Sequence, residues 1–271
     1  MLAHALALTT LTLAAAAPRL EAAVAVGAGY DSNLNNAAGP SAAVGSGFTA
    51  LRASGGASLD VGEATSLYGG LRLELERYQD VSDLTTGRAG LEAALVQELG
   101  RKWSITLAPS AAAIRVGDSA RDATLLAAQA TLRVKPVRDL ALRAFYGHTS
   151  RQARDAVFSA ERDRLGGSVE WRVSEGSYLT LAYAVERGDE VFYRSTSGGS
   201  VPMMGGRMVS LFGRNEEAFR APATSQLFTP SLELGLGGGV HLLASYDLRL
   251  VRSDVADFPT HSVFVGLGVR R

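Results

Sequence analysis

The sequence contains no cysteine. This excludes a disulfide framework, a cysteine nucleophile and a thiolate metal site. There is also no excess of charge of one sign, because 27 Lys and Arg balance 27 Asp and Glu. A nucleic-acid-binding surface is therefore not expected. The remaining His, Asp and Glu residues show no spacing typical of a metal or nucleotide site, so we expect neither a metal nor a cofactor.

Long hydrophobic runs are almost missing as well. The single example, residues 1–22, is rich in Ala and Leu and ends in small residues, although it carries no Lys or Arg before the apolar stretch. It predicts a secretory signal peptide, cleaved after Ala17 or, more favourably, after Ala22; a short amphipathic helix is the alternative. Residues 23–271 hold no apolar stretch of about 20 residues, the length that a membrane-spanning helix needs.

Residues 23–271 instead carry a two-residue alternation of apolar and polar side chains. In 240–251, Leu242, Tyr246 and Leu248 occupy one set of positions, and Asp247 and Arg249 the other. Such alternation predicts a strand with one apolar and one polar face. It recurs in about twelve segments: 22–32, 47–61, 65–79, 86–99, 102–116, 122–135, 138–151, 162–174, 177–190, 223–236, 239–253 and 259–270. Amphipathic helices in 91–99 and 125–132 are the local alternative.

The connections between these segments alternate in length. A long connection comes first, and short and long ones then alternate. The short connections are 61–64, 100–101, 136–139, 174–176 and 237–239. The long connections are 33–46, 80–85, 117–121, 152–161, 188–222 and 253–259. Outer-membrane barrels have short periplasmic turns and longer extracellular loops. We therefore predict an all-β chain, a single transmembrane antiparallel up-and-down barrel of about 12 strands spanning residues 23–271. It would lie in the cell outer membrane with both termini periplasmic, and its partners would be the lipid bilayer and the barrel assembly machinery. A soluble β-sandwich is the alternative.

Charged side chains occupy the polar faces of the predicted strands. The candidate lumen-lining residues are Arg52, Arg72, Glu74, Glu76, Arg88, Glu92, Arg143, Glu170, Arg172, Glu233, Asp247 and Arg249. Burying an unpaired ion costs several kcal/mol, so these groups either pair into a lattice that plugs the lumen or line a wet path. The two predictions are a structural barrel and a channel for small polar solutes. The loop Ser195–Arg207, rich in Gly and Ser, is a candidate gate.

One triplet of residues points to an enzyme instead. His148 and Ser150 share the lipid-facing parity of their strand, and Asp163 has matching parity on the next one. Histidine beside serine is the arrangement of an activated nucleophile. It resembles outer-membrane phospholipase A, which implies a lipid-face esterase using Ser150, His148 and Asp163. The residues after Ser150 depart from that family's pattern, which puts this activity in doubt. A hydrophilic loop base at the membrane interface is the alternative explanation of the triplet.

The first strand opens with the motif Gly29-Tyr30-Asp31-Ser32-Asn33-Leu34-Asn35. This motif resembles the barrel domain of the surface lipoprotein assembly modifier family and related porin-like proteins, as does the later segment 162–166 followed by Trp171. The resemblance implies an outer-membrane barrel. The chain has no tetratricopeptide half, so a substrate-handling role tied to that half is not implied. A barrel that docks a partner through its extracellular loops is the third functional alternative.

Overall fold

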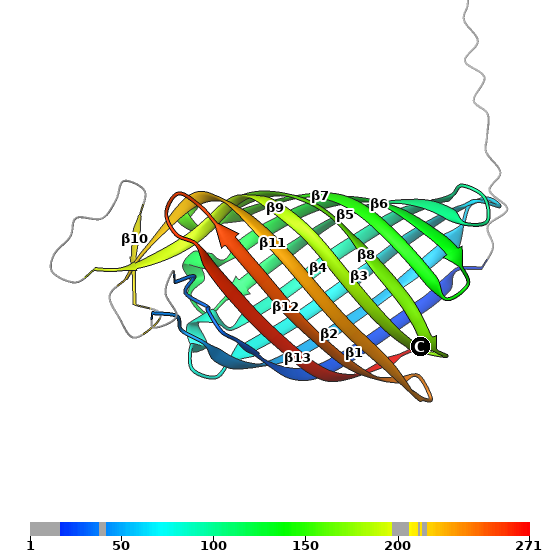
Figure 1. Cartoon of the computed structure of the whole chain (residues 1–271), viewed down its shortest axis with the longest axis horizontal. Coiled ribbons are helices and arrows are strands. Elements are labelled where there is room, and N and C mark those ends of the chain that lie inside the picture. Colours follow the sequence, from blue (N-terminus) through cyan, green and yellow to red (C-terminus); the bar gives the residue numbers. More distant parts are fainter. Residues whose placement is uncertain (1–16, 38–41, 197–205, 211, 213–215) are drawn as a thin grey trace, which may run out of the picture.

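The protein is seen here as a computed structural model that describes residues 17–37, 42–196, 206–210, 212 and 216–271. Twelve long antiparallel strands close into a barrel (Figure 1), which confirms the predicted fold class. They are β1 (Arg19–Asp31), β2 (Ser46–Asp60), β3 (Thr65–Tyr78), β4 (Thr86–Glu98), β5 (Trp103–Val116), β6 (Ala123–Val137), β7 (Leu140–Ala153), β8 (Ala160–Ser174), β9 (Ser177–Ser195), β11 (Glu216–Gly237), β12 (Val240–Arg252) and β13 (Phe258–Arg270). Each long strand pairs with the next along the chain, and β1 pairs with β13 to close the ring.

The two faces of each strand differ in exposure as the alternation predicts. On β3, Leu71, Leu73 and Leu75 are exposed on the outside of the barrel, and Glu74 and Glu76 are partly buried inside it. An apolar outer band and a polar interior are what a barrel in a bilayer requires. The described residues contain no helix long and apolar enough to cross a membrane. The segments 91–99 and 125–132, for which helices were the alternative, lie mainly in β4 and β6.

The two ends of the barrel differ. One end carries tight turns, and in three of them glycines adopt the left-handed backbone that other residues avoid (Gly100 at φ 86°, Gly176 at φ 70°, and Gly237–Gly239). The start of β1 and the C-terminus lie at this end (Figure 1). The other end, called the mouth below, carries the longer connections and the 3₁₀ helices η1 (Ser82–Leu84), η2 (Ser119–Arg121) and η3 (Ala156–Phe158). That the mouth is extracellular and both termini periplasmic stays a prediction.

Part of the predicted 188–222 loop is strand, which corrects the sequence-based boundaries. β9 and β11 run on as a pair to Ser195 and Glu216, beyond the rest of the barrel, and the short strand β10 (Arg207–Val209) adds to β11 (Figure 1). Gly188 and Pro222 suggested a break in the strands. Pro222 is tolerated because β11 pairs there with β9 alone, since its pairing with β12 begins at Thr224. Gly188 adopts φ 151° within the β9–β11 pair.

The position at which β1 starts affects the two predicted cleavage sites of the signal peptide differently. Arg19–Ala22 already pair with Gly55–Ser58 of β2. Cleavage after Ala17 would leave β1 whole, whereas cleavage after Ala22 would remove its first four residues. The extent of the signal peptide stays a prediction, and residues 1–16 lie outside the described part of the chain.

Candidate functional site

The barrel interior contains several cavities. The largest described here, of about 620 Å³, reaches from β3 through β4–β8 to Glu186 of β9. Others of about 440, 300, 240 and 160 Å³ lie nearer the two ends. The large cavity has room because β5 turns small residues inward, among them Ala108 and Ser110, and carries no charged side chain on that face within the barrel wall.

Neighbouring cavities share lining side chains. Arg52 lines three of them, and Arg72, Arg88 and Glu170 each line two. Cavities that share a side chain are separated by little more than that side chain. The interior is therefore a series of adjoining spaces, and arginine and glutamate side chains form the partitions.

The cavity walls carry more cations than carboxylates, although the whole chain has no net charge. This holds for each of the five cavities separately. The cations are Arg52, Arg72, Arg88, Arg121, Arg133, Lys135, Arg138, Arg151, Arg162, Arg164, Arg172 and Arg270, and the carboxylates are Glu74, Glu76, Glu92, Asp139, Glu170, Glu186 and Glu233. Half of the cations belong to β6, β7 and β8, where Glu170 is the only carboxylate in the set. The interior therefore has a basic wall.

Many of the interior charges are paired across strands. Glu170 accepts hydrogen bonds from Arg133 at 3.1 Å and from Arg143 at 2.8 Å. Glu74 likewise pairs with Arg72 at 2.7 Å and with Arg88 at 3.7 Å. One carboxylate between two guanidinium groups satisfies itself but leaves a net positive charge. The structure thus combines the two alternatives of the sequence: ion pairs form, and open space remains between them.

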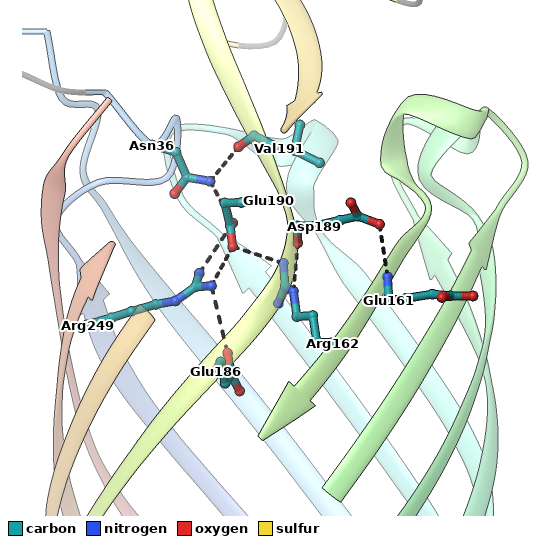
Figure 2. A network of polar contacts seen from close by, with 8 residues as sticks. All are labelled: Asn36, Glu161, Arg162, Glu186, Asp189, Glu190, Val191 and Arg249. Carbon is teal, nitrogen blue, oxygen red and sulfur yellow. Dashed lines mark hydrogen bonds and ion pairs between the residues drawn. The ribbon is translucent and has the colours of Figure 1, made fainter. Parts of the chain in front are cut away.

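A second cluster, the mouth network, ties four parts of the chain together across the lumen at the level of Glu190 of β9 (Figure 2). The side chain of Glu190 is 6% exposed and accepts hydrogen bonds from Arg162 of β8 at 3.1 Å, from Asn36 at 3.1 Å and from Arg249 of β12. Arg249 also lies 3.8 Å from Glu186. The mouth network therefore satisfies a buried carboxylate with two guanidinium groups and an amide.

Asn36 brings the β1–β2 connection into the mouth. Its amide also donates to the carbonyl oxygen of Val191 at 2.7 Å (Figure 2). Asn33 holds the same connection against β13, donating to the carbonyl of Pro259 at 3.3 Å. This connection consequently crosses from β1 to β9 inside the mouth and narrows the lumen there.

The connections that form the rim around the mouth are held in place by hydrogen bonds and apolar packing. The side chains of Asp118 and Asp155 accept hydrogen bonds from the backbone of η2 and η3, at Ala120 and Val157. A backbone N–H from Val116 and the Arg115 guanidinium hold the pKa of the rim carboxyl Asp122 below its usual range. Phe158, Val209 and Ala218 form an apolar cluster behind this rim.

The candidate lumen-lining residues all have the inward parity of their strands. Those that line a described cavity are Arg52, Arg72, Glu74, Glu76, Arg88, Glu92, Glu170, Arg172 and Glu233. Arg143 and Arg249 are held in ion pairs, and Asp247 accepts a hydrogen bond from Thr229 at 2.6 Å. Whether they act on a solute stays a prediction. Of the candidate gate Ser195–Arg207, residues 197–205 lie outside the described residues.

The candidate esterase residues lie on the outer face near the mouth. Asp163 contacts His148 Nδ1 at 3.0 Å and accepts a hydrogen bond from Tyr146 at 2.6 Å. An orienting carboxylate therefore stands beside the histidine. Within the described chain, no hydrogen bond joins Ser150 to His148, so the nucleophile-to-base contact of an activated serine is missing from this geometry. Tyr146 shares the Asp163 carboxylate with His148.

Several contributors to these sites escaped the sequence analysis. Glu190 fell where the predicted strand 177–190 and the predicted loop 188–222 overlap, and Asn36 carried no functional signal. Arg162 and Arg164 could have been found, because they continue the inward parity of Glu170 and Arg172 along the same strand.

Comparisons with known proteins agree with the fold. No protein-family model matches the sequence, and no curated protein shows significant sequence similarity to it. Among solved structures, an outer-membrane channel of the COG4313 group from Pseudomonas putida F1 is similar, with 13% identity, a TM-score of 0.55 and coverage of 93% of this chain and 95% of that one. The NanC porin is similar at 11% identity and a TM-score of 0.51, over 91% and 98% of the two chains.

Sequence identity this low supports a shared fold and nothing more specific. The finer resemblance to the surface lipoprotein assembly modifier barrel stays a prediction. Together, the strand pattern, the closed barrel and its structural neighbours support a β-barrel with the fold of outer-membrane porins.

Proposed function

We propose that the protein is a channel through which small polar solutes cross the outer membrane. The observation that carries the proposal is the series of adjoining cavities that share charged lining residues inside a closed barrel. A lumen plugged by a complete ion-pair lattice would leave no such spaces. The charged side chains that line these cavities would replace part of the hydration that a polar solute loses when it enters the lumen.

The charge of the cavity walls sets the expected selectivity. Because each described cavity is lined by more cations than carboxylates, anions have the lower electrostatic barrier. The excess is small and partly paired, so the preference should be moderate and should weaken as salt screens the wall charges.

Single-channel recording in a planar bilayer tests the proposal. The refolded protein should give discrete, reproducible conductance steps, and its reversal potential in a KCl gradient should show chloride preferred over potassium. Heat-modifiable mobility on a denaturing gel serves as the control for folding. A correctly folded barrel that passes no current would overturn the channel.

The lipid-face esterase is the second candidate, favoured by the contact of His148 with Asp163. Its test is phospholipid hydrolysis by the refolded protein in mixed micelles. Hydrolysis that disappears in Ser150→Ala, while the variant still folds and conducts, would establish the enzyme. Because Ser150 lacks a hydrogen bond to His148, we expect wild type and Ser150→Ala to be equally inactive.

A further inference from the structure

The Arg52 side chain packs against an aromatic residue of β13, the strand that pairs with β1 to close the barrel. The Phe264 ring of β13 is 6% exposed and rests on the inner surface of the sheet, where glycines make room for it. A Cβ at Gly27 of β1 would come within 2.4 Å of this ring, and one at Gly266 within 2.8 Å. The Arg52 guanidinium, from β2, lies over the ring at 4.6 Å from its centroid. The guanidinium is thus held in a cation–π contact with the ring.

The hydrogen-bond donors of Arg52 remain available. The residue directly opposite on β3 is Glu74, but Arg72 and Arg88 engage that carboxylate. Within the described residues, Arg52 makes no ion pair or side-chain hydrogen bond, unlike Arg72, Arg133 and Arg270 along the same lumen. A stacked guanidinium keeps its in-plane donors, which match the spacing of two oxygens in a carboxylate or phosphate.

The place of Arg52 in the lumen gives a ligand access to it. It is the residue shared by the cavities of about 240, 440 and 300 Å³, so anything moving between them passes it. Each of these cavities offers at least one more arginine to a bound anion, such as Arg270 or Arg88.

We propose that Arg52, held on Phe264, is a binding site for the oxyanion group of a solute, a carboxylate or a phosphate. The proposal rests on the proposed function, because it assumes that solutes reach the lumen. It names their chemistry: small molecules that carry at least one oxyanion.

Equilibrium binding to the refolded protein in detergent micelles tests this site without requiring conduction. The probes are inorganic phosphate, followed by ³¹P line width, and acetate, followed by ¹H line width. Wild-type protein should broaden at least one of the two signals. Arg52→Gln should weaken that binding about tenfold, the value of one charge-assisted hydrogen bond. Arg52→Lys, which keeps the charge but not the paired donors, should fall between.

Arg164→Gln is the matched control. It removes one positive charge that also lies over an aromatic ring, at 5.5 Å from the Phe145 centroid, but that already has Glu186 at 3.8 Å and lines a cavity that Arg52 does not line. Phe264→Leu should weaken binding while leaving every charge in place. No broadening by wild type, or equal losses in Arg52→Gln and Arg164→Gln, would overturn the site. Broadening of phosphate alone or of acetate alone would identify which oxyanion it takes. Binding by a barrel that passes no current would leave this site standing and overturn only the channel.

Discussion

Glu190→Ala is expected to lower the free energy of unfolding by about 3 kcal/mol or more, the cost of removing one partner from a buried ion pair. Glu190 is almost fully buried and holds Arg162, Arg249 and Asn36 in the mouth network (Figure 2). Without the carboxylate, two guanidinium groups lose their shared counter-ion: Arg249 keeps the 3.8 Å contact with Glu186, and Arg162 keeps the carbonyl of Asp189. The side-chain amide of Asn36 keeps its bond to Val191. Urea unfolding in lipid vesicles, followed by tryptophan fluorescence, measures the change.

Glu161→Ala is the matched control for this experiment. Glu161 also lies near the mouth, but its side chain is exposed on the outer face, and only its backbone N–H bonds to Asp189. We expect a change within about 0.5 kcal/mol, as for other exposed substitutions. Equal stabilities of Glu190→Ala and wild type would show that the mouth network contributes nothing to the fold.

Leu91→Arg is expected to destabilise the barrel by about 2–4 kcal/mol, the cost of a cation on the lipid face near the bilayer midplane. Leu91 lies near the middle of β4 and is 62% exposed on the outside of the barrel. A guanidinium at this depth lies far from both headgroup layers. The loss should appear in the same unfolding assay and as poorer refolding into vesicles.

Ser110→Arg places the same side chain on the opposite face of the wall at nearly the same height. Ser110 of β5 pairs in register with Glu92 of β4, the residue after Leu91, and lines the 620 Å³ cavity. Here the guanidinium meets water and the Glu92 carboxylate, so stability should stay within about 0.5 kcal/mol of wild type. Single-channel conductance should fall because the cavity narrows. If Ser110→Arg is as destabilising as Leu91→Arg, the assignment of inner and outer faces is wrong.

The fold could be predicted almost completely from the sequence, because in a membrane barrel the alternation of apolar and polar residues within each strand shows which of its faces points outward. Leu71, Leu73 and Leu75 face outward whatever their neighbours are, and the boundaries of β3 and β5 come out within one residue. The largest errors lie at the mouth, where β9 and β11 run five and seven residues beyond the predicted 177–190 and 223–236. There β9 and β11 run on beyond the rest of the barrel and pack against other connections, so local alternation no longer shows which side chains are buried, and most of this extension fell in the predicted loop 188–222.

The candidate site was predicted only in part. Inward parity selects Arg52, Glu74 and Arg249 equally well, yet their situations differ: Glu74 is shared by two arginines, Arg249 is held by Glu190, and Arg52 has no acidic partner in the described chain. Parity determines which face a side chain occupies, but not which side chains meet it.

The sequence by itself therefore determined the number of long strands, their inner and outer faces and the unequal connections, because each of these depends on residues close together in the chain. Only the tertiary structure decided which charges pair, where space remains in the lumen and that Phe264 supports Arg52. Those features depend on the register at which twelve strands close into a ring, which brings β13 beside β1 and Asn36 across to Glu190. The balance of 27 positive and 27 negative side chains could not reveal a basic wall, since sorting them between the lumen, the rim and the mouth network is the result of closure.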